Sequence, residues 1–152
     1  MRIFHNHLTV EAVRALFEFG TEEFARVVWR VRTMLFEEIA EHGLRVIYTM
    51  NTARGVAPAE TNEMSVARIE EAVTGHGGIV HYVHLEPSRA VLEARIVDPT
   101  RAAYGKLTDL DRARTQLQGW SSQPLSPTHL SIDNSALTPA EAASAIRDHY
   151  AL

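Results

Sequence analysis

The 152-residue chain contains no cysteine, which excludes disulfide bonds, thiolate zinc sites and cysteine nucleophiles. It also has no apolar run near the roughly 20 residues that a membrane-spanning helix needs. Met1 and Arg2 are not followed by a signal-peptide pattern. The net charge is −4, and the basic residues are scattered, which argues against a nucleic-acid partner. We therefore expect a cytoplasmic protein without a membrane partner.

The residues that are present favour one globular domain over residues 1–152. Hydrophobic residues make up 45% of the chain and charged residues 22%, which is ordinary for a globular protein. A chain of this length can bury a substantial core. We find no internal repeat and no composition shift that would mark a second domain.

Helical and strand patterns alternate along the first half. Arg2 to His5 is a brief candidate strand. Thr9 is a plausible N-cap of a helix that ends at Gly20. Thr21 is a plausible N-cap of a long helix that ends at Gly43. Leu44 to Met50 is a near-continuous apolar run, which predicts a strand covered on both faces.

The second half continues the alternation. A helix before Gly75 leads to a predicted strand over Ile79–Leu85, and Ser88 is expected to cap the next helix. Leu110–Trp120 predicts a further short helix. Leu130–Asp133 predicts the last strand, and the last helix opens at Thr138 and Pro139 with a capping-box Glu141. Strands separated by helices predict an α/β fold, a parallel sheet between helical layers.

Polar residues follow three of these strands. They are His5, Asn6 and His7 after the first, Thr49 to Thr52 after the second, and Asp133, Asn134 and Ser135 after the last. Ligands of open parallel sheets bind beyond the carboxyl ends of the strands. Asn, Asp, Ser and Thr are equally common in ordinary loops and helix caps. Each of the three groups, taken alone, can therefore be explained as a loop or a cap without a ligand site.

Arginines on the long helix form a second group of candidates. Arg30 and Arg32 lie among apolar neighbours, where a guanidinium can clamp a substrate anion with two hydrogen bonds. The simpler reading packs their stems against the apolar stripe and leaves their charged ends in water.

The segment LEARIVDPTRAAYGKL, from Leu92 to Leu107, carries three cations around a loop that follows Pro99. Arg95, Arg101 and Lys106 suit closure over an anionic ligand such as a triphosphate. The alternative is a solvated basic stretch balanced by neighbouring acids, which are Asp98, Asp109 and Asp111.

Eight histidines invite a metal site. His5 and His7 are predicted to share a strand face, yet no third ligand lies near them in sequence. The string His5-Asn6-His7 also raises a metal-dependent nuclease of the HNH type, although no further metal-ligand signature follows. We predict no metal site.

Taken together, these segments resemble the P-loop small-molecule kinases. The likeness is carried by FHNHLTVEAVRALFEFG, WRVRTMLFEEIAEHG, LRVIYT, VHLEPSRAVLEARIVDPTRAAYGKLTD and LSIDNSALTPAEAASAI. It is nearest to the AAA-type, shikimate-kinase-like and chloramphenicol-phosphotransferase-like members. It implies a three-layer fold whose parallel strands lie in the order 2-3-1-4-5, with ATP and Mg²⁺ as cofactors and a small-molecule acceptor.

The resemblance also implies roles for individual residues. His5, Asn6 and His7 would lie near the phosphoryl acceptor, with Arg32 or Arg30 on the substrate-binding helix. Thr49 would end the strand where Mg²⁺ and the attacking hydroxyl are organised. Arg95 and Arg101 would be cations of a lid, about residues 95–107. The residues beside the adenine would be Asp133, Asn134 and Ser135.

One family motif is missing. The phosphate-binding sequence GxxxxGK[ST] occurs nowhere, and Lys106 follows a single glycine after the lid helix. We expect that loop and its strand to precede Met1, from a misplaced start or a truncation. The missing strand is the central one, between Leu44–Met50 and Ile79–Leu85. Unpaired strand edges give a physical motive for homo-oligomerisation.

The expected function is ATP-dependent phosphorylation of a metabolite hydroxyl, impaired in this chain because the phosphate loop is absent. The competing expectation is a non-catalytic pseudo-kinase module that binds a phosphorylated ligand or a partner chain.

Overall fold

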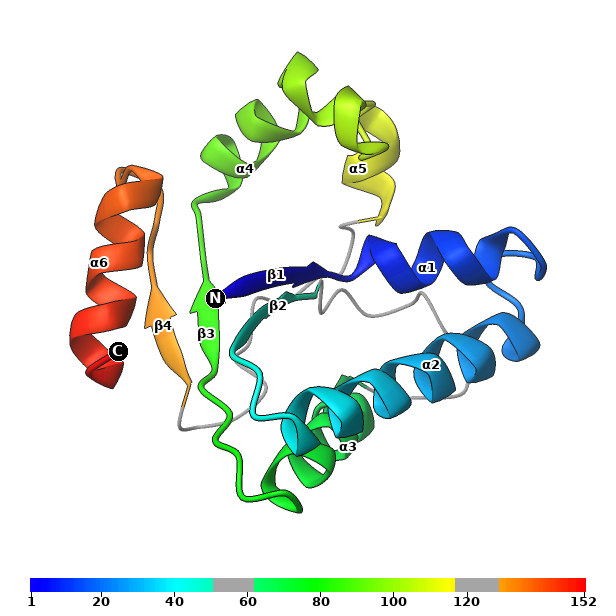
Figure 1. The fold of residues 1–152 in the computed structure, drawn as a ribbon. Helices are drawn as coiled ribbons and strands as arrows, with labels where there is room; N and C mark the ends of the chain where they lie inside the picture. The colour runs from blue at the N-terminus through cyan, green and yellow to red at the C-terminus, as the bar shows by residue number, and fades with distance from the viewer. Residues whose placement is uncertain (51–61, 117–128) are drawn as a thin grey trace. The chain divides into compact units, whose positions relative to one another are not determined.

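The computed structural model describes residues 1–50, 62–116 and 129–152, and the chain divides into two compact units, Met1–Val80 and His81–Leu152 (Figure 1). We describe each unit by itself. Both are mixed α/β, and each contains one two-stranded parallel sheet, β1–β2 in the first unit and β3–β4 in the second. Parallel pairing is thus confirmed. A single domain and a three-layer sandwich stay predictions.

Helices and short strands alternate through both units. Unit 1 contains β1 (Arg2–His5), α1 (His7–Arg14), α2 (Glu22–Glu41), β2 (Val46–Thr49) and α3 (Asn62–Thr74). Unit 2 contains β3 (Val83–Leu85), α4 (Arg89–Ile96), the 3₁₀-helix η1 (Pro99–Tyr104), α5 (Leu110–Gln116), β4 (Leu130–Ile132) and α6 (Pro139–Tyr150). No helix among the described residues is long and apolar enough to cross a bilayer.

The core of unit 1 lies between the β1–β2 pair and the helices α2 and α3. The ring of Phe4 lies 5.6 Å from that of Phe36 and 5.2 Å from that of Tyr48. Phe36 belongs to the apolar stripe of α2, and α3 adds Ile69 to the same cluster. The amphipathic pattern of α2 therefore fixes one sheet face against the helices.

Within unit 1 the described residues leave the opposite face of this sheet exposed, whereas the sequence predicts a strand covered on both faces. Ile3 and Ile47 are opposite one another in register and are 68% and 47% exposed. Side chains alternate along a strand, and the neighbours Phe4 and Tyr48 already take the face that packs on the helices.

Helix α1 begins earlier than predicted. Asn6 occupies the N-cap position with helical backbone angles, and the helix starts at His7. Thr9 is not the cap; its buried hydroxyl donates to the Asn6 carbonyl at 3.0 Å. The helix thus follows β1 directly, and it ends at Arg14, before the predicted stop at Gly20.

The predicted strands are shorter in the structure. Of the predicted strand Leu44–Met50, only Val46–Thr49 is paired. Of the predicted strand Ile79–Leu85, only Val83–Leu85 is paired. The predicted strand Leu130–Asp133 is paired over Leu130–Ile132. A strand extends only as far as its partner offers ladder hydrogen bonds, and β1 and β4 offer four and three residues.

The helix caps agree well with the sequence. Thr21, Ser88 and Thr138 each accept a hydrogen bond from a backbone N–H of the helix they precede. Glu141 completes the predicted capping box. The predicted helix Leu110–Trp120 is described only as far as Gln116.

The segment after Pro99 is more ordered than the predicted loop. Residues Pro99–Tyr104 form the helix η1, with Asp98 as the N-cap and Gly105 in the left-handed conformation (φ 61°) after it. A proline at the first helical position is compatible with this geometry because its missing N–H has no helical partner there.

Candidate functional site

The strand ends in unit 1 bring the first predicted residues together. His5 and Thr49 are opposite one another at the carboxyl ends of β1 and β2. The Asn6 N–H donates to the Thr49 carbonyl at 3.1 Å, which extends the pairing to the turn. The rings of His5 and His7 lie 6.4 Å apart. This edge is the candidate site of unit 1.

Arg32 of α2 reaches this edge and is only 6% exposed. Its Nε donates to the Thr9 hydroxyl at 2.9 Å, and its Nη2 donates to both the backbone and side-chain oxygens of Asn6. The guanidinium also lies 4.6 Å from the Trp29 ring centre, a cation–π contact. Arg32 therefore fastens the β1–α1 turn to the long helix.

Among the described residues, no carboxylate forms an ion pair with the Arg32 guanidinium. Burial lowers the pKa of Arg32, an effect partly opposed by Tyr48. Burial likewise raises the pKa of the Tyr48 phenol, so it stays neutral near pH 7. Among the described residues, the buried Tyr48 hydroxyl has no hydrogen-bond partner.

Arg30 lies elsewhere, although it is only two residues from Arg32. It is exposed and lines a shallow groove of about 390 Å³ with Arg68 and residues of α2, which are Thr33, Met34 and Glu37. The structure thus separates the two arginines that the sequence treated as alternatives, and it brings Arg32 to the strand edge.

The last predicted group gathers in unit 2. Arg95, in the last turn of α4, donates from Nη2 to the Asn134 carbonyl at 2.7 Å. The Ser135 hydroxyl accepts the Ser88 N–H at 2.7 Å, and its own N–H donates to the Asp133 carboxylate at 2.9 Å. The Ser135 hydrogen bonds lower the pKa of Asp133. Arg95 and the loop after β4 therefore form one polar cluster.

Arg101 forms hydrogen bonds within its own segment, residues 101–107. Its Nε donates to the Leu107 carbonyl at 3.3 Å, and its carbonyl accepts the Lys106 N–H at 3.2 Å. These bonds close the segment around η1. The segment carries Arg101 half-buried and Lys106 exposed.

Sequence reasoning missed two groups of polar residues. The sequence predicts Thr9 as a helix cap, whereas in the structure its hydroxyl accepts a hydrogen bond from Arg32. Glu93 accepts hydrogen bonds from Arg89 at 2.7 Å and from Arg114 at 2.7 Å. These two arginines lower the pKa of Glu93 to about 2. The four-residue spacing of Arg89 and Glu93 was a local signal; nothing in the sequence pointed to Arg114.

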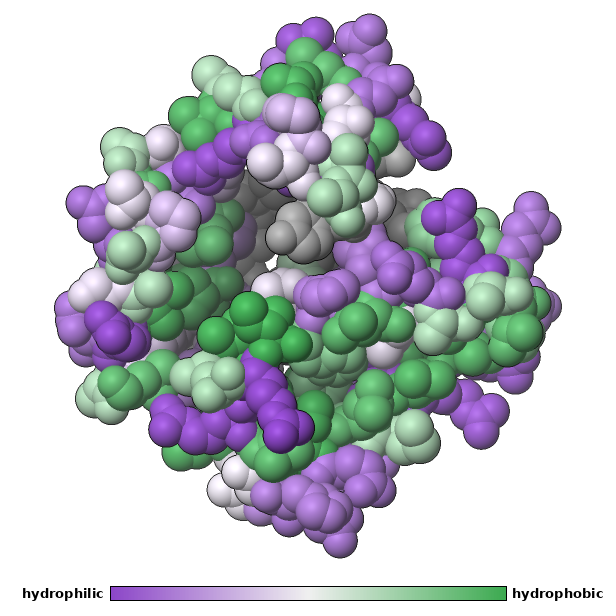
Figure 2. Space-filling model, turned by 45° about the horizontal axis from the view of Figure 1, so that its top comes forward, coloured by the Kyte–Doolittle hydropathy of each residue, from purple (hydrophilic) through white to green (hydrophobic). Residues whose placement is uncertain are grey.

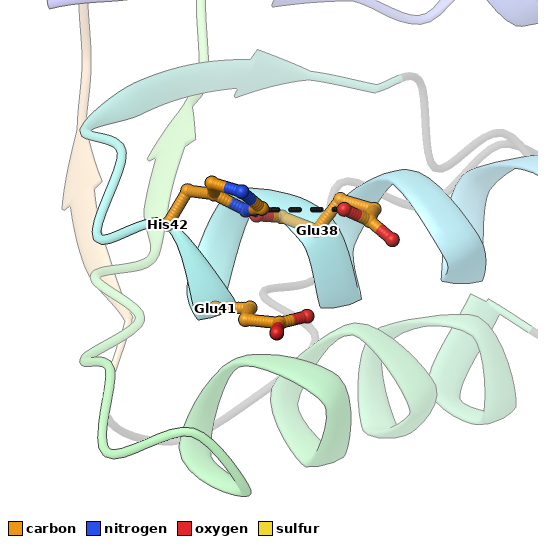
Figure 3. A group of neighbouring side chains, drawn as sticks. All are labelled: Glu38, Glu41 and His42. Carbon is orange, nitrogen blue, oxygen red and sulfur yellow. Dashed lines mark hydrogen bonds and ion pairs between the residues drawn. The ribbon is translucent and has the colours of Figure 1, made fainter.

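The predicted common strand face of His5 and His7 is wrong, because His5 ends β1 and His7 begins α1. A different group has potential metal ligands close together in the described part of the chain. Glu38, Glu41 and His42 end α2, with their ligand atoms within 4.8 Å of one another (Figure 3). All three are exposed, and His42 Nδ1 already contacts the Glu38 carbonyl at 2.9 Å.

ATP and Mg²⁺ stay predictions from the resemblance. Lys106 follows Gly105 after a 3₁₀-helix, so it does not join a strand to a helix as a phosphate-loop lysine does. Predicted positions from Asn51 to Thr52 lie outside the described residues. The described residues thus form two separate polar groups, one at the strand ends of unit 1 and one around Arg95 and Asn134 in unit 2.

Comparison with known proteins adds no assignment: no family model matches the chain, and neither a curated protein nor a solved structure matches it.

Proposed function

We propose that this chain is the acceptor-binding and lid part of a P-loop-type small-molecule kinase. The observation that carries the proposal is the pairing in each unit. β1 pairs only with β2 and β3 only with β4 among the described residues. The resemblance requires these same two pairs, on either side of a central strand that none of the described residues forms.

Within this proposal the edge in unit 1 receives the acceptor. His5 and Thr49 are opposite one another where a metabolite hydroxyl would be placed, and the His5 imidazole is suited to accept its proton. Arg32 orders the turn that carries His5 and Asn6. Positioning of this kind is the larger part of catalysis in phosphoryl transfer.

Unit 2 supplies the cations and the base-binding loop in the same proposal. Arg95 and Arg101 would stabilise charge on the transferred phosphoryl group. Residues 133–135 would lie beside the adenine, in a loop that Arg95 already orders through Asn134. Because the described residues offer no phosphate cradle, we expect weak ATP binding and slow turnover from these 152 residues alone.

The test begins with the reading frame upstream of Met1. A strand followed by GxxxxGK[ST] supports the kinase proposal, and the extended protein should then bind ATP with Mg²⁺ in isothermal titration. Arg101→Ala should weaken that binding, whereas the matched variant Arg26→Ala, at an exposed position of α2, should not. An extended protein with the motif that binds no ATP would refute the proposal.

The absent phosphate cradle favours one alternative, a non-catalytic module that binds a phosphorylated ligand or a partner chain. Stop codons directly upstream of Met1 would support it. Titration of the 152-residue chain with simple phosphometabolites would then show binding without ATP turnover, and no binding to either ligand class would refute both ideas.

A further inference from the structure

One side of α2 carries a stripe of solvent-facing side chains. Each member lies three, four, seven or eleven residues from Arg30, so all share one face of the helix; with Arg30 they are Arg26, Thr33, Met34, Glu37 and Glu41. All are exposed except Thr33, which is half-buried. The buried residues of α2 that join the core, Trp29 and Phe36, belong to the other side of the helix. The stripe is therefore a surface that the core of unit 1 does not use.

The charges of this stripe are segregated along the helix. Arg26 and Arg30 lie in the N-terminal half of α2, and Glu37 and Glu41 lie in the C-terminal half. Like charges four residues apart on a helix repel one another. Among the described residues, none of these four side chains forms an ion pair. The stripe thus keeps two like-charged pairs, one of each sign, without opposite charges to balance them.

The charge pattern of the stripe is complementary to itself in the reverse direction. Consider two copies of α2 that are antiparallel and share a midpoint between Thr33 and Met34. Arg30 of each copy is then opposite Glu37 of the other, and Arg26 is opposite Glu41. Both pairings occur twice, as they must in an interface with two-fold symmetry. The two helix dipoles are antiparallel in the same arrangement, which is their favourable orientation.

The surface beside the stripe is hollowed along the seam between α2 and α3, which pack side by side (Figure 1). The groove of about 390 Å³ is lined by four members of the stripe and by Arg68. A second hollow of about 300 Å³ lies between Glu37 on α2 and Glu71 on α3. Met34 is 52% exposed at the middle of the stripe. An apolar centre with charged residues around it is the usual arrangement of a protein–protein interface.

We propose that this stripe is a self-association surface, through which two copies of the chain form a two-fold dimer with antiparallel α2 helices. Met34 lies at the symmetry axis, and the pairs Arg30–Glu37 and Arg26–Glu41 lie on both sides of it. The dimer is weak and sensitive to salt, because each exposed ion pair contributes little and is screened by ions. The surface is separate from the strand edges, and the proposal does not rest on the kinase assignment.

The first test is analytical ultracentrifugation of the full chain over a wide range of protein concentration. It is run at low ionic strength and in about 1 M NaCl, where the Debye length is only about 3 Å. A reversible monomer–dimer equilibrium that NaCl weakens supports the proposal. A chain that stays monomeric at every concentration in low salt overturns it.

Charge reversal then tests the pairing itself. Arg30→Glu and, separately, Glu37→Arg each place like charges opposite one another at two positions of the dimer. Each should raise the dimer dissociation constant by about tenfold or more. The combined variant Arg30→Glu/Glu37→Arg restores both pairs with reversed sign and should recover the dimer. That recovery excludes misfolding as the cause of the single-variant losses.

A matched control places the same charge change outside the stripe. Arg147→Glu, at an exposed position of α6, should leave the dissociation constant unchanged. A dimer that tolerates Arg30→Glu as well as Arg147→Glu would use another surface and would overturn the proposal. So would a combined variant that fails to recover the dimer.

Disulfide cross-linking tests the position of the axis, since the chain has no cysteine of its own. Met34→Cys brings two thiols together beside the axis, and mild oxidation should give a covalent dimer. Leu16→Cys is the control, at a position that is 82% exposed in the same unit but outside the stripe, and should cross-link far less. Equal cross-linking at the two positions would contradict the antiparallel register.

Discussion

The two units differ in what stabilises them. Unit 1 has an aromatic and aliphatic core around Phe4, Trp29 and Phe36, with a second apolar cluster between α1 and α2. Unit 2 buries fewer and smaller apolar groups among its described residues, namely Ile96, Ala113, Ile132 and Ala142. Apolar burial involves no titrating group, so we expect the two units to respond differently to a change of pH.

Polar interactions are correspondingly prominent in unit 2. Glu93 bridges Arg89 and Arg114, and through Arg114 it links α4 to α5. The Tyr150 hydroxyl donates to the Tyr82 carbonyl at 2.5 Å and so ties the end of α6 to the chain before β3. A small parallel sheet is therefore accompanied by a large apolar core in unit 1 and by a network of polar contacts in unit 2.

The largest expected effect is the removal of a core ring from unit 1. Phe36→Ala should destabilise unit 1 by about 3–5 kcal/mol, because the side chain contacts both Phe4 and Tyr48 and its loss leaves a cavity. Urea denaturation followed by NMR of each unit measures it. Phe19→Ala, at a position that is 50% exposed, is the control and should cost much less. Equal losses would argue against this core.

Helix caps should contribute equally to the stability of the two units. Thr21→Ala in unit 1 and Thr138→Ala in unit 2 each remove a side-chain acceptor and should each cost about 1 kcal/mol. Thr21→Ser and Thr138→Ser keep the hydroxyl and should restore most of the stability. A much larger cost at Thr138 than at Thr21, measured by urea denaturation, would show that unit 2 depends on its caps more strongly than we propose.

Two tyrosines should behave differently when their hydroxyls are removed. Tyr150→Phe breaks the bond to the Tyr82 carbonyl and should cost about 1 kcal/mol in unit 2. Tyr48→Phe removes a buried hydroxyl that has no hydrogen-bond partner among the described residues, so unit 1 should be unchanged or slightly stabilised. Thermal melts of both variants measure the difference, and a clear loss in Tyr48→Phe would reveal a partner for that hydroxyl.

Acid should weaken unit 2 with the smallest effect, because solvent partly screens the Glu93 carboxylate, whose side chain is 21% exposed. The pKa of Glu93 is about 2 in the folded protein, below its ordinary value of 4.5. Its contribution is therefore fully present above pH 4.5 and is lost as the pH falls through about 2. Amide exchange across this range measures the loss, which Glu93→Gln should reduce. An equal pH dependence in that variant would exclude Glu93 as the cause.

Local features of the fold were largely predictable from the sequence. The caps at Thr21, Ser88 and Thr138 depend on neighbours within three residues, and all three are confirmed. The strands were placed correctly but drawn too long, because strand length depends on the partner strand and not on the apolar run itself. The exposed face around Ile47 was missed because composition cannot show which face a helix covers.

The candidate site was predictable only in part. The polar residues after each strand were identified from chain order, whereas the partner of Arg32 was not. Thr9 is 23 positions away from Arg32 in sequence, and Asn6 is 26 positions away. A sequence pattern shows that Arg30 and Arg32 lie on different sides of a helix, but not which side meets the strand ends.

The surface of the described residues keeps several apolar side chains among polar ones (Figure 2). Leu16, in the turn that follows α1, is 82% exposed, and Met34 is 52% exposed on α2. Singly exposed apolar residues are common on folded proteins and do not by themselves indicate an interface.

The parallel pairing of β1 with β2 has a consequence for the order of synthesis. Arg2 pairs with Val46, so β1 is made 44 residues before its partner (46 − 2). At roughly 5–20 residues per second, β1 leaves the ribosome several seconds before any strand can pair with it. Val83 and Leu130 repeat the delay in the second sheet. A nascent chain of this protein therefore exposes an unpaired strand twice, and chaperone contact during translation should peak at those two intervals.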